Sequence, residues 1–434
     1  MTENLEKTDV YLAGDYKRSR VAYIAECTFE YFVALLVSDA YLASLLRYMG
    51  IGDGMITIIS SLISLAFLFQ LVALIAVKHI VNVKRASIIF HFASQLFFMS
   101  LFLVPFLPIP NQYKTFVVIS CVLVAYFGNY LVTTVIYKWG MSYVDPSKRA
   151  SFGATKEMTS LISGMVFTLA IGFALDGFTE AGNVTGGFIF IAVGILLCSI
   201  ADLICLLVMK TPKAEEREKK SEPISSVVKK LFANKAYVCL IVVGILMYVA
   251  MYMINGSMGA YKTGDLGFSI GEIQVINTVG VLFRFAVSKP IGKLSDKTSY
   301  VTGMMLGFSM LALCFALNVF TTPSTRWMIL AYSLLYNGAQ AAIHQNFFNS
   351  IYDYVGNEYF VHATSIRAAI SGISGFLASL ASAAILKRVQ DNGNVVFGMD
   401  MRAQQLLSAI AFVVVLILLA FVFFVLRKQK KVSE

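Results

Sequence analysis

Charged residues are scarce in this sequence. Asp, Glu, Lys and Arg make up 14% of its 434 residues, whereas a soluble domain carries about 25%. Hydrophobic residues make up 58% of the chain, and the mean hydropathy is +0.74. This balance excludes an ordinary soluble domain and predicts an all-α integral membrane protein with many spans.

Cysteine and histidine follow no pattern that indicates a disulfide framework or a metal site. All six cysteines lie inside apolar runs, so we interpret them as small core residues. The four histidines lack metal-ligand spacing, and His91 is expected to form only a packing hydrogen bond with Gln95. The chain shows no nucleophile–base motif and no glycine-rich phosphate loop. We therefore expect no metal, no cofactor and no catalysis. A membrane enzyme is a remote alternative, and so is a membrane sensor, which would need a large cytoplasmic appendage.

A membrane span needs about 20 mostly apolar residues. Twelve runs of this kind predict twelve transmembrane helices. Their expected positions are 21–46, 54–77, 86–108, 115–137, 152–175, 187–209, 236–260, 270–288, 300–320, 326–350, 360–386 and 403–426.

Lysine and arginine indicate the orientation of these spans, because cytoplasmic loops carry more of them. With both termini in the cytoplasm, 26 of the 35 basic residues fall in inside segments and 7 in outside segments. Topology and contact with the lipid bilayer thus explain the net charge of +10, and we expect no nucleic-acid partner. The first twenty residues show no apolar segment typical of a cleaved signal peptide. Compact loops favour a bacterial inner membrane.

One long charged segment, TPKAEEREKKSEPISSVVKK (211–230), divides the predicted spans into six and six. It predicts a solvated linker, and a regulatory site is the alternative. The expected organisation is a cytoplasmic segment 1–20, a six-helix half 21–209, a cytoplasmic linker 210–235, a second six-helix half 236–426 and a cytoplasmic tail 427–434.

The two halves resemble each other weakly, as in transporters built from repeats. GIGDGMI (50–56) before the second span matches GFSIGEI (267–273) before the eighth. YVDPSKRASFGATKEMTSLISG (143–164) and IYDYVGNEYFVHATSIRAAISG (351–372) share an Asp, a Phe and an Ile-Ser-Gly triplet at a constant offset. These two pairs of matching segments predict two pseudo-symmetric halves.

With these features the sequence resembles the major facilitator superfamily over essentially its whole length. The best local match is PIGKLSDK (290–297), in which Gly292, Asp296 and Lys297 fit the family's Gly-x-x-x-Asp-(Arg/Lys) loop. The resemblance implies a conformational latch at the cytoplasmic side, with Asp296 as an acceptor for a helix end and Gly292 allowing close helix approach. An ordinary turn with a solvated charge is the alternative. The first-half counterpart, AVKHIVNVKR (76–85), keeps only the trailing Lys-Arg, so its role as a latch stays open.

The family fold implies that spans 1, 4, 7 and 10 surround a central chamber. At about 100° per residue, each of these spans gathers polar and aromatic residues on one face. Four such faces favour a water-filled path over hydrogen bonds between packed helices, which is the alternative for any single face. The candidate solute-binding residues are Tyr126, Asn129, Tyr130 and Thr133 on span 4, Tyr248, Tyr252 and Asn255 on span 7, and Tyr336, Asn337, Gln340 and His344 on span 10.

The chemistry of these faces limits the cargo. Amides and phenols form neutral hydrogen bonds and aromatic rings stack on apolar surfaces, which suits carbohydrates and glycosides. Nucleosides and small polyols fit as well. A strongly anionic solute would need several arginines in these four spans, and their central parts contain none.

Two acidic residues, Glu26 and Glu30, lie one helical turn apart on the chamber side of span 1. Burial and mutual repulsion favour a protonated carboxyl group, so we predict that this pair couples transport to H⁺. The alternatives are a structural pair with arginine and simple exposure in a cytoplasmic vestibule.

Further charges inside the predicted spans require partners. Arg284 and Arg367 are expected to form buried ion pairs, and we favour a structural role for Arg367. The sequence does not identify the partners of Asp39 and Asp202.

The leading prediction is a monomeric secondary active transporter that imports a small polar solute, a carbohydrate or glycoside, together with protons by alternating access. The alternative is a proton-coupled exporter of drugs or metabolites. Exporters of the family usually carry a Gly-Pro motif in span 5, whereas SLISGMVFTLAIGFALDG (160–177) contains glycines but no proline. The Pro-Glu-Ser motifs of the sugar porters are also missing after span 6. Substrate identity, stoichiometry and direction stay open.

Overall fold

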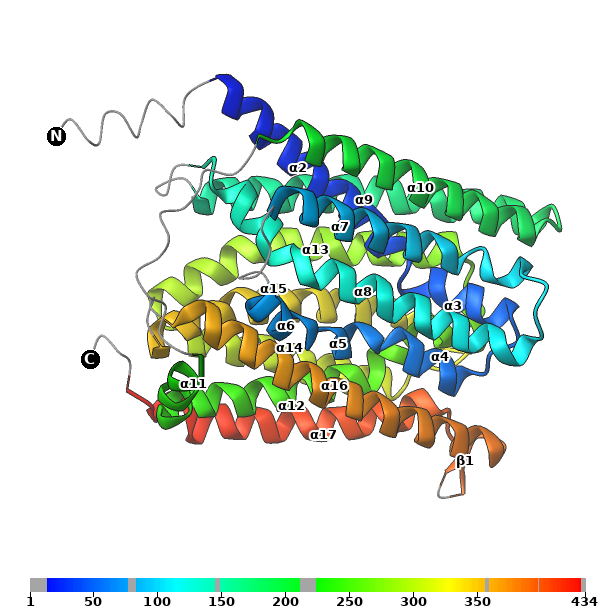
Figure 1. Ribbon diagram of the computed structural model, residues 1–434. Coiled ribbons are helices and arrows are strands. Elements are labelled where there is room, and N and C mark those ends of the chain that lie inside the picture. The colour runs from blue at the N-terminus through cyan, green and yellow to red at the C-terminus, as the bar shows by residue number, and fades with distance from the viewer. Residues whose placement is uncertain are drawn as a thin grey trace. The chain divides into compact units, whose positions relative to one another are not determined.

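The computed structural model of the chain is almost entirely helical (Figure 1) and describes residues 14–76, 83–144, 149–210, 224–355, 359–396 and 398–430. Contacts group the chain into two compact units. The N-terminal unit comprises residues 1–49 and 72–219, and the C-terminal unit comprises residues 50–71 and 220–434. The boundaries of the two expected six-helix halves stay a prediction, and most of the expected linker lies outside the described residues.

Long helices run side by side in the N-terminal unit (Figure 1). They are α2 (Gly14–Leu36), α3 (Asp39–Tyr48), α7 (Val83–Leu101), α8 (Asn111–Met141), α9 (Arg149–Glu180) and α10 (Val184–Val208), with a 3₁₀ turn η2 (Val104–Phe106). Helix α2 packs against α9 and α10, and α7 packs against α8 and α10. This packing brings the first, third and sixth predicted spans together.

The first predicted span is broken. Helices α2 and α3 meet at an angle of 42°. Asp39 begins α3 with a positive φ of 45°, and the Ser38 hydroxyl donates to the Leu35 carbonyl at 3.0 Å. A side chain at positive φ interrupts the regular helix, so Asp39 lies at the break and not on a continuous helical face.

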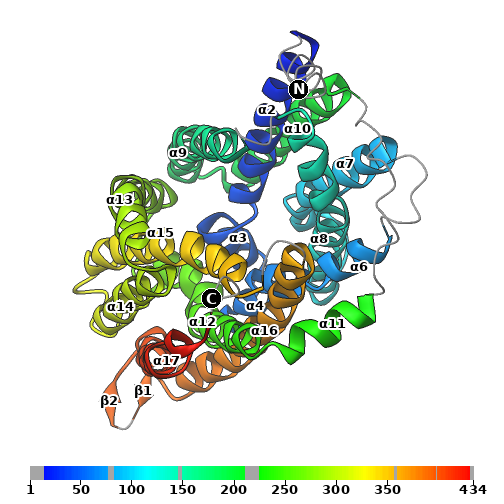
Figure 2. The same cartoon turned by 90° about the vertical axis from the view of Figure 1, so that its left-hand side faces the viewer.

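The C-terminal unit contains both long and short helices and one small hairpin (Figure 2). Helix α12 packs against α16 and α17, α14 packs against α15 and α17, and α13 packs against α15. The elements are α4 (Asp53–Ser60), α5 (Leu62–Ala66), α11 (Ile224–Ala233), α12 (Lys235–Ala260), a π-helical turn η4 (Tyr261–Asp265), α13 (Ile270–Lys297), α14 (Tyr300–Asn318), α15 (Met328–Val355), α16 (Phe360–Asp391), β1 (Val395–Val396), β2 (Met399–Asp400), α17 (Ala403–Phe424) and a 3₁₀ turn η5 (Leu426–Lys428). Helix α6 (Phe69–Ala76) crosses the boundary between the units.

Glycines allow the short helices α4 and α5 to lie close to α12 and α16. A Cβ at Gly256 would lie 2.5 Å from the Ser61 hydroxyl, and one at Gly372 would lie 2.3 Å from the Ser64 carbonyl. Small residues permit such backbone contact between membrane helices. The expected second span, 54–77, contains three short helices separated by turns at Ser61 and at 67–68. Residues 53–72 are nevertheless long and apolar enough together to cross a membrane.

Several helices begin at residues whose side chains bind the free backbone amides of the first turn. Asn183 accepts from the amide of Gly186 at the start of α10, and Asn234 accepts from two amides at the start of α12. Ser269 and Glu272 form a reciprocal capping box at the start of α13. Such caps fix where a helix starts, so these boundaries are encoded locally.

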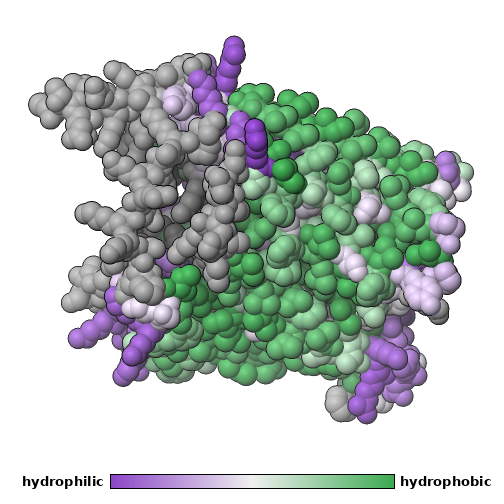
Figure 3. Space-filling model, viewed as in Figure 1, coloured by the Kyte–Doolittle hydropathy of each residue, from purple (hydrophilic) through white to green (hydrophobic). Residues whose placement is uncertain are grey.

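In the described residues, nine helices are long and apolar enough to cross a membrane, and the bent pair α2 and α3 makes a tenth. Helices α7 and α15 occupy the positions of the expected third and tenth spans but are not among these ten. On the face shown in Figure 3, hydrophobic residues cover the middle of the helices and hydrophilic ones gather toward their ends. This distribution is that of a membrane protein.

Two connecting segments differ from expectation. Residues 290–297, expected as a loop, form the last two turns of α13, which continues through Pro290. A helix of 28 residues spans about 42 Å at 1.5 Å per residue, more than the roughly 30 Å of hydrocarbon, so its last turns can extend beyond the lipid. The hairpin of β1 and β2 was not expected.

Candidate functional site

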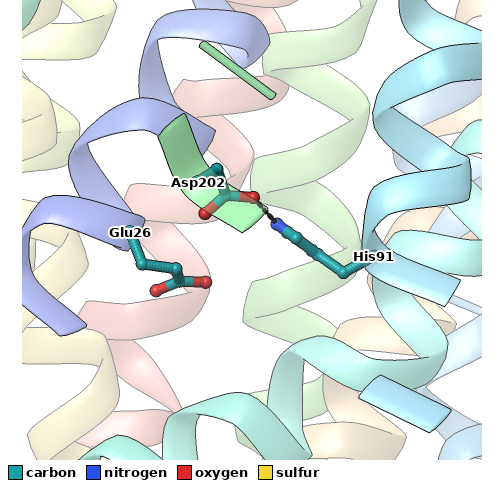
Figure 4. A group of neighbouring side chains, drawn as sticks. All are labelled: Glu26, His91 and Asp202. Carbon is teal, nitrogen blue, oxygen red and sulfur yellow. Dashed lines mark ion pairs between the residues drawn. The ribbon is translucent and has the colours of Figure 1, made fainter. Parts of the chain in front are cut away.

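Three titratable side chains meet inside the N-terminal unit (Figure 4). Glu26 comes from α2, His91 from α7 and Asp202 from α10, and each is 1% exposed. His91 Nε2 lies 2.7 Å from Asp202 Oδ2 in an ion pair. One possible ligand atom from each of the three residues lies within 4.8 Å of the others. We call this group the acid–histidine cluster.

Neighbouring side chains position the members of the cluster. Gln95, one turn along α7, places its amide nitrogen 3.4 Å from His91 Nε2. The same Nε2 lies 2.7 Å from Asp202 Oδ2, and a proton on Nε2 that is donated to this carboxylate excludes a hydrogen bond from the Gln95 amide. The Cys27 thiol donates to Glu26 Oε2 at 3.2 Å. Within the described part of the chain, His91 Nδ1 and Asp202 Oδ1 have no hydrogen-bond partner.

The charges around the cluster are mostly negative. Asp202 lies near His91, which is positive when protonated, and near the carboxyl groups of Glu30 and Glu26. The Lys156 ammonium of α9 lies 5.5 Å from the centre of the Tyr23 ring, one turn before Glu26 on α2. Glu30 lies one turn beyond Glu26 on α2 and is partly exposed. Carboxylates thus outnumber the single imidazole in a region that lipid surrounds, and such an excess of charge favours uptake of a cation.

The geometry of the acid–histidine cluster suits a shared proton better than a metal ion. A nitrogen and an oxygen donor are the kind of ligands that divalent transition metals take. Two donors that each bind one metal at about 2.1 Å lie about 3 Å or more apart, whereas the His91–Asp202 pair is at 2.7 Å. That separation is typical of a direct charged contact.

The predicted residues of the fourth span lie on α8. Tyr126 stacks on Tyr130, with ring centres 6.1 Å apart, and meets Phe98 of α7 edge to face at 5.0 Å. The Thr133 hydroxyl donates to the carbonyl of Asn129 at 2.7 Å. These four candidates therefore form an aromatic and polar strip on one helix, and Thr133 has a partner within that helix.

The predicted residues of the seventh and tenth spans meet within the C-terminal unit. The Asn255 amide of α12 donates to the Tyr336 hydroxyl of α15 at 2.8 Å. Gln340 is buried, and its amide lies 3.8 Å from the sulfur of Met251. The structure thus joins Asn255, Tyr336 and Gln340 in one polar group.

Other members of these faces have separate contacts. Tyr248 and Tyr252 stack on each other with centres 5.5 Å apart. Asn337 donates to the Ser333 carbonyl at 2.9 Å, in its own helix. Lys262, which also falls on the face of the seventh span, is buried beside Asn277 of α13 at 3.4 Å.

Three basic residues, Arg284, His344 and Arg367, lie within the long helices α13, α15 and α16 of the C-terminal unit. His344 of α15 is exposed, and the charges that act on it are those of Arg284 and Arg367. Arg367 stacks on the ring of Phe347 at 4.5 Å. No ion pair between Arg367 and a described residue is present, so its expected ionic partner is replaced here by an aromatic ring.

The proposed latch residues lie in the last turns of α13. Asp296 and Lys297 are exposed. A Cβ at Gly292 would meet no atom within 4 Å, so this glycine supports no close helix approach in this structure. Most of the first-half counterpart, 76–85, lies outside the described residues, although Lys84 donates to the Met209 carbonyl at 2.5 Å at the end of α10.

The sequence interpretation missed two members of the acid–histidine cluster. His91 was assigned a packing role, and Asp202 had no identified partner. Both are polar residues inside apolar spans, which is the only sign of a site that the sequence offers. Pairing His91 with Asp202 requires the knowledge that α7 and α10 pack against each other.

Comparison with known proteins agrees with a helical bundle that carries polar groups inside its spans. The family model of the Major Facilitator Superfamily matches residues 21–379 and 240–434. No curated protein sequence matches the chain significantly. Matching solved structures include a variant of the nucleoside transporter NupG, with a TM-score of 0.71, 13% identity and coverage of 93% of this chain and 98% of that one.

Two further structures have the same fold. A bacterial homologue of the human lysosomal transporter Spinster matches with a TM-score of 0.68, 12% identity and coverage of 96% of this chain and 98% of the other. An auto-inhibited peptide transporter of the POT family matches with a TM-score of 0.67, 10% identity and coverage of 96% and 98%.

The family match and the apolar helices identify a multi-pass membrane transporter. The chain belongs to the Major Facilitator Superfamily.

Proposed function

We propose that this transporter imports a small polar solute, a carbohydrate or glycoside, together with protons by alternating access. The observation that carries the proposal is the acid–histidine cluster, in which Glu26 and Asp202 are buried with a single imidazole, His91. Two buried carboxylates and one imidazole cannot all lose their protons without leaving net negative charge in hydrocarbon. Binding and release of H⁺ by this group would supply the coupling.

The polar groups of the C-terminal unit support the class of solute. The amide–phenol contact between Asn255 and Tyr336, with Gln340 beside it, offers donors and acceptors for hydroxyl groups. The stacked rings of Tyr248 and Tyr252 offer a flat apolar surface. Solved structures with the same fold include proteins named as nucleoside and peptide transporters, and both solutes are polar.

The topology that goes with this function has twelve spans and cytoplasmic termini. Counting α7 and α15 with the ten apolar spans gives twelve. The surplus of lysine and arginine on one side favours that orientation. We further propose a monomer in a bacterial inner membrane and six-helix halves at 21–209 and 236–426.

Reconstituted protein tests the proton coupling. Liposomes with an inward proton gradient are offered labelled sugars, glycosides and nucleosides, and accumulation is compared with exchange of labelled for unlabelled solute. Glu26→Gln and Asp202→Asn should each abolish accumulation and leave exchange, because exchange requires no net proton movement. The matched control is Glu157→Gln on α9, an exposed acid that should leave both intact.

Three results would contradict the proposal. Full accumulation by both variants would remove the cluster from coupling. Equal loss of accumulation and exchange in well-folded variants would assign it to binding or structure. Movement of solute against the direction of the proton would identify an exporter.

A further inference from the structure

Arg367 of α16 is partly exposed, and it forms no ion pair with an acidic residue among those that the structure describes. Its Nε–H group is buried and donates no hydrogen bond to a described residue. Its guanidinium carbon lies 4.5 Å from the centre of the Phe347 ring. An aromatic ring compensates a cation that is partly removed from water only in part.

A second polar group beside Arg367 also lacks a partner. The Ser371 hydroxyl, one turn further along α16, is buried and makes no hydrogen bond to a described residue. The backbone of α12 passes close by, since a Cβ at Gly244 would lie 2.4 Å from this hydroxyl and 3.7 Å from the Arg367 Cγ. The Arg367 side chain and the Ser371 hydroxyl thus both lie beside Gly244 of α12, and neither the Arg367 Nε–H nor the Ser371 hydroxyl has a hydrogen-bond partner among the described residues.

His344 of α15 lies within the range of two arginines, one of which is Arg367. His344 of α15 is exposed although it lies deep in its helix, and both charges that act on it, Arg284 and Arg367, are positive. A region of this kind attracts an anion. Arginine binds a carboxylate through two parallel hydrogen bonds, which other cationic side chains cannot reproduce.

Tyr248 connects Arg367 with the polar group of Asn255 and Tyr336. Tyr248 lies one helical turn after Gly244 on α12, and Asn255 lies two turns after Tyr248 on the same helix. A Cβ at Gly375, two turns beyond Arg367 on α16, would lie 3.3 Å from the Tyr248 ring. One small molecule could therefore place a carboxylate at Arg367 and hydroxyl groups at the amide–phenol contact. Arg367 lies seven residues after Phe360, the first residue of α16, which is about 10 Å along the helix axis. A lipid phosphate is therefore the competing anion, and inorganic phosphate serves as its probe in the test below.

We propose that Arg367 binds a carboxylate of the transported solute, so that the substrate is a small hydroxylated acid of the sugar-acid type. This inference rests on the proposed function, because it names the solute of that same transporter. It narrows the proposed carbohydrate to an acidic one, because Arg367 of the expected eleventh span adds a cation to the neutral donors and acceptors of spans 4, 7 and 10.

Matched pairs of acids and neutral molecules test the inference on the purified full chain in detergent. Thermal unfolding is measured with glucuronate against glucose, lactate against lactamide, benzoate against benzamide, and inorganic phosphate alone. At least one carboxylate should raise the unfolding temperature above that of its neutral counterpart, since ligands of the native state stabilise it.

Two variants assign that effect to Arg367. Arg367→Gln should weaken binding of the stabilising acid at least about tenfold, the loss of one charge-assisted pair, and Arg367→Lys should recover it in part. The matched control, Arg388→Gln, changes an exposed arginine of the same helix and should bind the acid normally. Size-exclusion profiles establish that each variant is folded.

Four outcomes would overturn the inference. They are no acid-specific stabilisation in any pair, equal stabilisation by the neutral counterpart, stabilisation by phosphate alone, and normal acid binding by Arg367→Gln. The comparison of acids with neutral counterparts uses the unaltered protein, so it stands even where a variant fails to fold.

Proton-driven uptake distinguishes this inference from the proposed function. Acid binding at Arg367 without dependence of uptake on the proton gradient would remove the coupling and leave the anion site. Proton-driven accumulation of neutral solutes alone would support the coupling and remove the anion site.

Discussion

The amide of Asn255 on α12 donates a hydrogen bond of 2.8 Å to the hydroxyl of Tyr336 on α15. The two residues are 81 positions apart in the chain, yet each was selected from the sequence by its place on a polar helical face. Their contact joins the faces of the seventh and tenth predicted spans within one unit. It also uses one amide donor of Asn255 and leaves further donors and acceptors for a solute.

This contact predicts a coupled pair of substitutions. Asn255→Leu and Tyr336→Phe should each lower the free energy of unfolding by about 1 kcal/mol, the net value of one hydrogen bond. The double variant should lose less than the sum, because both changes remove the same bond. Thermal unfolding in detergent measures the cycle, with Ser309→Ala, an exposed hydroxyl on α14, as the control. Strict additivity would show that the bond does not contribute to stability.

Gly372 predicts a large effect from a single methyl group. An added Cβ would lie 2.3 Å from the carbonyl oxygen of Ser64, and a backbone atom cannot rotate away. Gly372→Ala should therefore destabilise the protein by about 1–3 kcal/mol, as overpacking does. In the control Gly194→Ala on α10, no atom lies within 4 Å of the new Cβ, so stability should stay equal or rise by up to about 1 kcal/mol. Similar unfolding temperatures for the two variants would contradict the close approach of α5 and α16.

The membrane class and the positions of most helices could be predicted from the sequence, because long apolar runs and helix caps are local signals. The breaks inside the first and second spans could not. The first depends on the positive φ of Asp39, and the second on the packing of α4 and α5 against α12 and α16. Both features depend on tertiary contacts that an apolar run does not reveal.

Contacts in the candidate site could be predicted from the sequence where both residues lie on the same helix. Periodicity alone grouped Tyr126 with Tyr130, and Tyr248 with Tyr252, and both pairs stack in the structure. The ion pair of His91 and Asp202 was not predictable, since it joins residues more than a hundred positions apart on α7 and α10. The same limit applies to Arg367, since only the packed bundle shows that no described acidic residue forms an ion pair with it.

The latch proposed at the end of α13 predicts an effect on transport without an effect on stability. Asp296 is exposed, so Asp296→Asn should leave the unfolding temperature unchanged. If the carboxylate binds a helix end in another state of the cycle, its loss removes a charged hydrogen bond of about 1.5–3 kcal/mol, and uptake should slow about tenfold or more. Initial uptake rates in liposomes measure this, with Lys293→Gln, another exposed charge of α13, as the control. An unchanged rate would leave Asp296 as a solvated surface charge.

We predict that proton-driven accumulation depends on the titratable groups of the acid–histidine cluster and not on the packing of their neighbours. His91→Gln keeps a donor for Asp202 but removes the imidazole that shares a proton with the carboxylates, so accumulation driven by a proton gradient should be lost while exchange persists. Gln95→Leu removes the neighbouring amide, which lies 3.4 Å from the imidazole, without any change of charge, so accumulation should continue. Uptake and exchange are measured in the same liposomes at equal protein content. Equal loss in both variants would mean that the cluster stabilises the helices instead of carrying the proton, because only the first substitution alters the number of groups that bind one.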